Sequence, residues 1–149
     1  MRRASVSSDD GSASLEFLTA GVLLLVPLVY LVGTLSSLQS AALAVEGAAR
    51  QAARVYVQQG SMGEAEAAAE RAIRVTLADY GLSADRTAAD VACKPVPGEC
   101  LTRRGFVTIT VEAVLPLPLV PALPGLDVSP GITMSASATA QVSRFRVDG

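Results

Sequence analysis

The pattern of hydrophobic and polar residues begins with one long apolar stretch. The segment from Phe17 to Leu38 contains no charged residue, and a short polar tail precedes it. At a rise of about 1.5 Å per residue, a helix over this segment measures about 33 Å, which is enough to cross the hydrocarbon core of a membrane. We therefore predict a single transmembrane helix over residues 12–38, followed by a larger domain over residues 39–149.

A helical period continues after the apolar stretch, over residues 40–59. Glu46, Arg50 and Arg54 recur at every fourth position and form a polar stripe. The opposite side of this segment is apolar, and its residues are Val45, Ala48, Ala49, Ala52, Val55 and Tyr56. An apolar face of this kind packs against a core in a globular domain. The pattern predicts that the transmembrane helix continues outside the bilayer as far as Gly60.

A second, shorter helix is predicted over residues 62–80. Ser61, followed by Glu64 three positions later, matches the capping box that begins many helices. Gly81 and Leu82 match a helix C-cap and its hydrophobic partner. We expect this helix to fold back beside the end of the first one.

The hydrophobic period changes to two in the later part of the chain, which indicates strands with one buried face. Residues 105–115 alternate between apolar and mostly polar positions, and residues 131–143 alternate more regularly. A weaker strand over residues 87–93 would pair with the first of these through a turn. The sequence thus predicts an α+β fold, in which an antiparallel sheet of about three strands packs on the two helices.

Cys93 and Cys100 flank that turn, whose sequence is KPVPGE. Proline and glycine favour a tight turn, and a cysteine on each side of it suits a disulfide. Closing so short a loop stabilises the fold by roughly 2–2.5 kcal/mol. A metal site is the alternative, but two thiols without histidine partners make a poor set of ligands. We favour the disulfide, which indicates an oxidising, extracytoplasmic location.

The segment PLPLVPALPGLDVSP, residues 116–130, is rich in proline and leucine. Proline removes backbone donors and favours extended conformations. The segment is either a connection whose leucines cover the sheet edge or the helices, or an exposed strip that binds a partner. The first interpretation is favoured.

Composition excludes several classes of function. Only 4% of the residues are aromatic, so the core must be built from small and β-branched side chains. The net charge is −2, whereas nucleic-acid binding requires a basic surface, and we expect no nucleic-acid partner. The chain has no histidine and no phosphate-binding or nucleophile-elbow motif. We interpret Glu64, Glu66 and Glu70 as a solvated helix face, and we expect no enzymatic activity, metal site or cofactor.

The basic residues predict the orientation of the membrane helix. Arg2 and Arg3 lie in the N-terminal tail, whereas Arg50 and Arg54 lie well beyond the apolar stretch. This bias favours a cytoplasmic N-terminus and an extracytoplasmic C-terminal domain in the cell membrane. A cleavable secretory signal is the main alternative, but its apolar core is about 7–15 residues, shorter than the one here. A twin-arginine signal is disfavoured because the residues that follow Arg3 do not match.

The sequence GSASLEF, at the start of the apolar stretch, places Glu16 as the fifth residue after Gly11. A polar leader ending in glycine, a fifth-position glutamate and an uninterrupted apolar helix resemble the signal of type IV pilins. The pair Glu16–Phe17, the alanine-rich helical continuation and the late strands of small residues are similar to the TadE/TadG-type minor pseudopilins of the tight-adherence (Tad, Flp) pilus system. The resemblance is strongest from Gly11 to about Tyr56.

The resemblance implies a pilin-like fold and a structural role in a Tad-type pilus or a related secretion apparatus. Residues 1–11 would be a leader peptide, removed by a prepilin peptidase that cuts between Gly11 and Ser12. Glu16 and Phe17 would be assembly residues, with Glu16 pairing with the new amino terminus of a neighbouring subunit. The implied partners are membrane lipid, the prepilin peptidase, other pilin or pseudopilin subunits and Tad assembly proteins. A mature subunit could then enter a surface pilus.

Two alternatives remain open at the sequence level. Glu16 could be an interfacial carboxylate near a helix N-terminus, where its charge suits the helix dipole. The chain could also be an uncleaved, single-pass membrane protein that binds a partner through its proline-rich segment. The acidic pair Asp9–Asp10, directly before Gly11, differs from the basic flank typical of the pilin signal.

Overall fold

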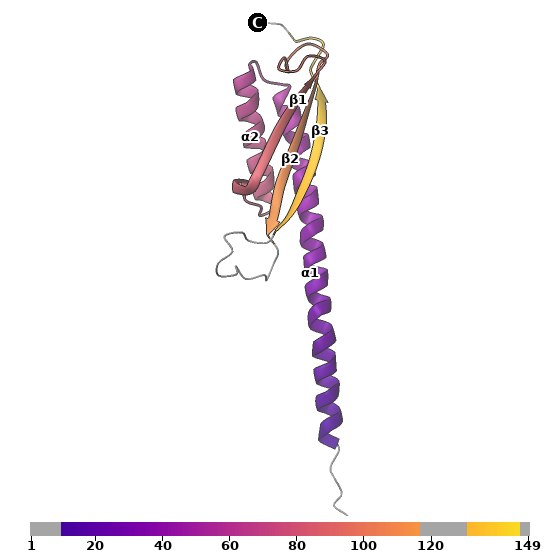
Figure 1. Cartoon of the computed structure of the whole chain (residues 1–149). Coiled ribbons are helices and arrows are strands. Elements are labelled where there is room, and N and C mark those ends of the chain that lie inside the picture. The colour runs from indigo at the N-terminus through magenta and orange to yellow at the C-terminus, as the bar shows by residue number, and fades with distance from the viewer. Residues whose placement is uncertain (1–9, 117–130, 147–149) are drawn as a thin grey trace, which may run out of the picture. The chain divides into compact units, whose positions relative to one another are not determined.

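The computed structural model describes residues 10–116 and 131–146, which form helices and one antiparallel sheet (Figure 1). The elements in chain order are α1 (Asp10–Tyr56), α2 (Met62–Asp79), the short 3-10 helix η1 (Ala84–Arg86), β1 (Thr87–Lys94), β2 (Phe106–Pro116) and β3 (Gly131–Gln141). This arrangement confirms the predicted α+β fold class. The proline-rich segment considered as a docking strip lies almost wholly outside the described residues.

The chain divides into two compact units, Met1–Ser36 and Ser37–Gly149, and α1 contributes residues to both. In the described part of the first unit, the apolar side chains of α1 are exposed; the exposed fractions of Phe17 and Leu24 are 79% and 73%. This helix is long and apolar enough to cross a membrane. Pro27 lies inside it without ending it, as is common in membrane helices.

The hydroxyl groups within the apolar part of α1 are hydrogen-bonded along the helix. The Thr19 hydroxyl donates to the Leu15 carbonyl at 2.7 Å, and the Thr34 hydroxyl donates to the Tyr30 carbonyl at 2.8 Å. A hydroxyl with a backbone partner can enter hydrocarbon at much lower cost than one without a partner. These two threonines are therefore compatible with a membrane-spanning segment.

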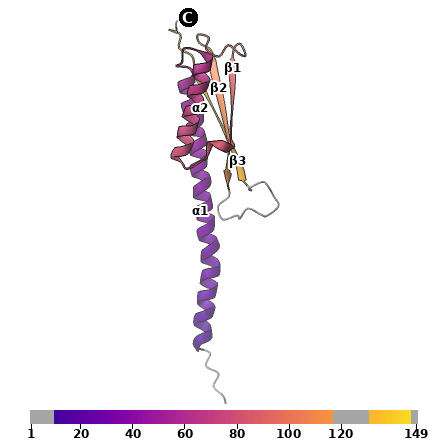
Figure 2. The ribbon, with the colours of Figure 1, turned by 90° about the vertical axis from the view of Figure 1, so that its left-hand side faces the viewer.

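The second unit has two layers, which Figure 2 shows edge-on. The C-terminal part of α1 and the whole of α2 cover one face of the sheet. The core between the layers contains many alanines, with β-branched residues from the sheet. Its largest fully buried side chains are Tyr56, Leu77, Ile109, Val45, Val107, Val111 and Val142. The predicted apolar side of α1 is the buried one, whereas Glu46, Arg50 and Arg54 are exposed.

Helix α1 ends at Tyr56, a little before the predicted end near Gly60. Its last turn tightens, because the Gln58 N–H donates to the Val55 carbonyl at 3.2 Å and the Gln59 N–H donates to the Tyr56 carbonyl at 3.3 Å. Bonds between residues three apart are typical of helix ends and satisfy carbonyls that have no partner within the α-helix.

The predicted caps of α2 are both present. At its start, the Ser61 hydroxyl oxygen accepts from the Glu64 N–H at 3.4 Å. At its end, the Gly81 N–H donates to the Ala78 carbonyl and the Leu82 N–H donates to the Leu77 carbonyl, both at 2.9 Å. This pair of bonds is the Schellman motif, which requires a left-handed residue after the cap. Gly81 provides it with φ of +72°.

The sheet has the order β1-β2-β3 with antiparallel pairs throughout. The central strand, β2, alternates as predicted: Val107, Ile109 and Val111 are fully buried. The connection between β1 and β2 contains the predicted disulfide between Cys93 and Cys100, whose Cα atoms are 4.9 Å apart. Both cysteines are buried in the core cluster, so the disulfide also contributes apolar contacts.

The apolar side of β3 is covered less completely than the alternation predicts. Val142, just after the strand, is fully buried, but the positions within it are only partly buried, and Ile132 is 38% exposed. The partly buried residues are Met134, Ala136, Ala138 and Ala140. The physical reason is the position of β3 at the edge of the sheet, where no further described strand flanks it.

Candidate assembly site

The residues that the pilin-like signal singles out lie at the beginning of α1. Because the helix begins at Asp10, the peptide bond between Gly11 and Ser12 lies within its first turn, and Glu16 and Phe17 follow in the next turn. Residues four apart lie on the same side of a helix, so Ser12 and Glu16 share one side of α1. Phe17 is the neighbour of Glu16 in sequence and is also exposed.

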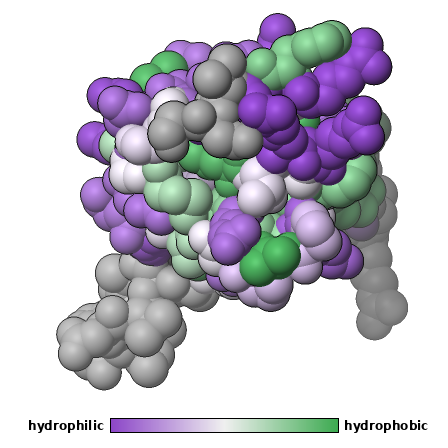
Figure 3. Space-filling view, turned by 90° about the horizontal axis from the view of Figure 1, so that it is seen from above, coloured by the Kyte–Doolittle hydropathy of each residue, from purple (hydrophilic) through white to green (hydrophobic). Residues whose placement is uncertain are grey.

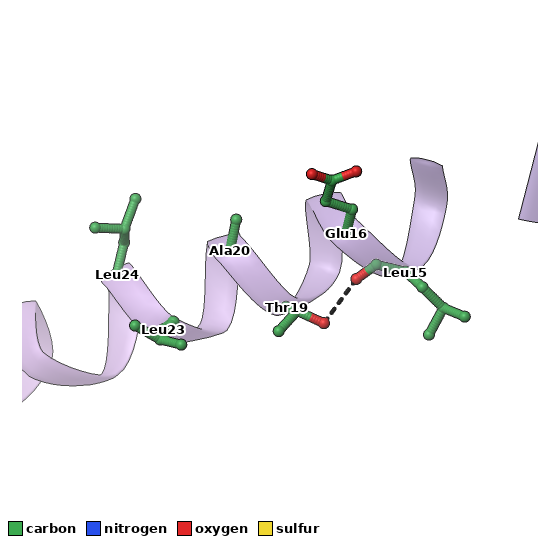
Figure 4. A pocket seen from close by; sticks show the side chains of 6 residues that line it. All are labelled: Leu15, Glu16, Thr19, Ala20, Leu23 and Leu24. Atoms are coloured by element: carbon green, nitrogen blue, oxygen red, sulfur yellow. Dashed lines mark hydrogen bonds between the residues drawn. The ribbon is translucent and has the colours of Figure 1, made fainter. Parts of the chain in front are cut away.

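The Glu16 side chain stands beside a shallow hollow on the helix surface (Figure 4). The side chains of Glu16, Ala20 and Leu24 follow one another along one side of the helix, and the Glu16 carboxylate points away from Leu15. The hollow is lined by Leu15, Glu16, Thr19, Ala20, Leu23 and Leu24. The small Ala20 side chain, one turn after Glu16, leaves room for a residue of another helix to approach the carboxylate.

Glu16 has no ion-pair partner among the described residues. The ion pair found there joins Arg50 and Glu46, with 2.8 Å between the guanidinium nitrogen and the carboxylate oxygen, on the polar stripe of α1. A carboxylate at the edge of a bilayer is costly unless it is paired or reaches water. The exposed Glu16 therefore fits a group that is satisfied by another molecule or by the membrane surface.

Sequence reasoning named Glu16 and Phe17 but did not include Thr19 and Ala20, which line the hollow. The signal was available, because these residues lie three and four positions after Glu16 and must share its side of the helix. The internal hydrogen bond from Thr19 to the Leu15 carbonyl, drawn in Figure 4, keeps its hydroxyl from competing for the carboxylate.

The second unit shows no comparable charged site in its described part. Glu64, Glu66 and Glu70 are exposed on α2, as expected for a solvated face. No group of histidine, cysteine, aspartate and glutamate side chains among the described residues is arranged to bind a metal. Seen from above, hydrophilic residues surround smaller apolar clusters on this unit (Figure 3), which is typical of a solvated surface.

Comparisons of this chain with protein-family models, with curated proteins and with solved structures find no match.

Proposed function

We propose that this chain is a structural subunit, a minor pseudopilin of a Tad-type pilus or a related secretion apparatus. A prepilin peptidase cuts it between Gly11 and Ser12 at the cytoplasmic face, and the mature helix then packs with other subunits. The proposal includes a single-pass arrangement with residues 39–149 on the extracytoplasmic side. The alternating strands and the disulfide support a folded, oxidised domain on that side.

The observation that carries the proposal is the exposed Glu16 on an apolar, uncovered helix, at the fifth position after Gly11. Cutting after Gly11 creates an ammonium group on Ser12. A neighbouring subunit can bring this ammonium to Glu16, and the pair then neutralises a charge that is otherwise costly at the bilayer. The same ammonium lies on the same side of its own helix as Glu16, one turn away, so a subunit awaiting assembly has an interim partner.

The mass of the N-terminal peptide tests the proposal directly. The full chain is produced in membranes with an active prepilin peptidase, and in matched membranes with an inactivated peptidase. We expect a mature N-terminus at Ser12 in the first case and an intact N-terminus in the second. A chain that keeps Met1 and Gly11 with the active peptidase contradicts the proposal and favours the uncleaved anchor that binds a partner through residues 116–130.

The variant Gly11→Val provides a matched control for this measurement. Glycine lets the backbone before the cut enter a protease cleft in extended form, whereas a β-branched side chain restricts that approach. We expect Gly11→Val to insert in the membrane normally and to remain uncut. Equal processing of Gly11→Val and the unchanged chain would show that the cut, if present, does not depend on this glycine.

A further inference from the structure

The strand β3 forms one edge of the sheet in the part of the chain that the structure describes. Every residue from Gly131 to Gln141 is paired with a residue of β2 in one unbroken antiparallel register. The order β1-β2-β3 leaves the other side of β3 without a described strand. An edge strand has unpaired backbone groups and is a template for pairing with another strand.

The hydrogen-bond register determines which backbone groups of β3 point outward. The Val142 N–H donates to the Gly105 carbonyl at 2.9 Å, one step beyond the paired residues Phe106 and Gln141. Bonded and non-bonded pairs alternate in an antiparallel ladder. The even-numbered residues of β3 therefore bond to β2, and the odd-numbered residues direct their N–H and C=O groups outward. The outward residues are Thr133, Ser135, Ser137, Thr139 and Gln141.

A side-chain contact agrees with this assignment. The hydroxyls of Thr108 and Thr139 are 2.8 Å apart across the two strands. Side chains approach most closely in non-hydrogen-bonded pairs. The pair Thr108–Thr139 is of that kind in the register derived from Val142, so the backbone groups of Thr139 point away from β2.

The two edges of the sheet differ in their protection against pairing. The β1 edge is short and carries Asp90 and Lys94, and Pro95 follows the strand directly. Charges and prolines of this kind are typical devices that prevent edge pairing. The β3 edge spans Gly131 to Gln141 without one charged residue or proline. The protected edge and the unprotected edge belong to one sheet, so the difference marks β3 as the edge that receives a strand.

The partial burial of the β3 core-side residues points the same way. Met134, Ala136 and Ala138 pack on the core cluster but remain partly accessible. An added strand would lie beside these residues and place its own inward row next to them. The sheet would then continue with the same alternation of apolar and polar faces.

We propose that the β3 edge pairs with β3 of a second copy of this chain, so that two three-stranded sheets join into one. The strand has no charge, so two copies meet without the like-charge repulsion that opposes identical strands. Its serine, alanine and threonine side chains are small, so neither face of the joined sheet is crowded. This contact is independent of cleavage after Gly11, because β3 belongs to the unit Ser37–Gly149.

Cysteine cross-linking of the full chain in membranes tests the proposal. Thr133, Ser135, Ser137 and Thr139 are replaced by cysteine one at a time, and a mild oxidant is added. The native cysteines are already joined to each other. We expect a cross-linked species of twice the chain mass. Cross-linking near one position indicates antiparallel pairing of the two β3 strands, and cross-linking at every position indicates parallel pairing; either result supports the second copy.

Asp90→Cys is the matched control for Ser137→Cys. Both positions lie opposite Thr110, one on each edge of the sheet, and both are exposed. We expect dimer from Ser137→Cys to exceed dimer from Asp90→Cys severalfold. Equal yields from the two edges, no dimer from any β3 position, or cross-links to a protein of different mass would each overturn the proposal.

A pair of proline variants separates edge pairing from folding. Ser137→Pro removes an outward N–H and leaves the bonds between β2 and β3 in place, whereas Ala138→Pro removes one of those bonds. In the Ser135→Cys background, we expect Ser137→Pro to retain the thermal midpoint and to lose most of the dimer. Ala138→Pro should lower the midpoint itself. An unchanged dimer yield in Ser137→Pro, with a retained midpoint, contradicts the proposal.

Discussion

At the scale of single residues, one carboxylate distinguishes the membrane helix from a plain anchor. Glu16 is exposed and has no ion-pair partner among the described residues. The variant Glu16→Gln retains the size and polarity of the side chain and removes the charge. We expect normal membrane insertion, because an uncharged side chain costs less in the bilayer, but loss of assembly, because the ammonium on Ser12 has no counter-charge. Membrane fractionation and co-isolation with pilus components measure the two effects.

Thr19→Ala is the control for that variant, since Thr19 lines the same hollow and its hydroxyl bonds to its own helix. Retained assembly in Thr19→Ala, together with loss in Glu16→Gln, would assign the effect to the charge. Full assembly of Glu16→Gln would leave Glu16 as an interfacial carboxylate that favours the helix dipole.

The alanines of the core are a second feature of single residues. Ala65 is fully buried on α2, whereas Ala67, two positions later on the same helix, is exposed. We expect Ala65→Leu to destabilise the fold by about 1–3 kcal/mol, because added methylene groups force neighbours from their positions. Ala67→Leu has room and should have little effect. Thermal unfolding of the detergent-solubilised chain compares the two, and equal midpoints would contradict close packing of α2 on the sheet.

At the scale of elements, the ends of α2 allow the same substitution with opposite expected effects. Gly81 has φ of +72° and open space around a Cβ atom, so Gly81→Ala is opposed by the backbone alone and should cost about 1 kcal/mol. Gly63 lies within the first turn of α2, also with open space, so Gly63→Ala should stabilise the helix by about 0.5 kcal/mol. The thermal midpoint should fall in the first variant and rise in the second; a rise in both would contradict the Schellman geometry.

The elements were largely predictable because their signals are local. Ser61 and Glu64 identify the start of α2 within a few residues, and Gly81 with Leu82 identifies its end. Period-two alternation located β2 and β3, and the sequence between the two cysteines located the turn. The end of α1 was less predictable, since bonds between residues three apart terminate the helix before Gly60 without any breaking residue at Tyr56.

At the scale of the whole molecule, membrane orientation can be measured by thiol labelling. In intact cells, we expect Cys93 and Cys100 to be joined and unreactive, because the proposed location is oxidising. A cysteine introduced at Ser5, in the N-terminal tail, should react with an impermeant reagent only after the membrane is opened. Labelling of the Ser5→Cys variant from outside, or free thiols at positions 93 and 100 in intact cells, would contradict the orientation.

The sequence by itself determined the apolar helix, the α+β class, the caps of α2, the disulfide and the order of the elements. Each depends on residues close together in the chain, where periodicity and turn chemistry act. Only the tertiary structure decided that β3 is an uncovered edge, that its alanine row is half covered, and that Ala20 leaves a hollow beside Glu16. These features depend on which surfaces remain free after distant segments have packed, and alternation along one strand carries no information about its neighbours.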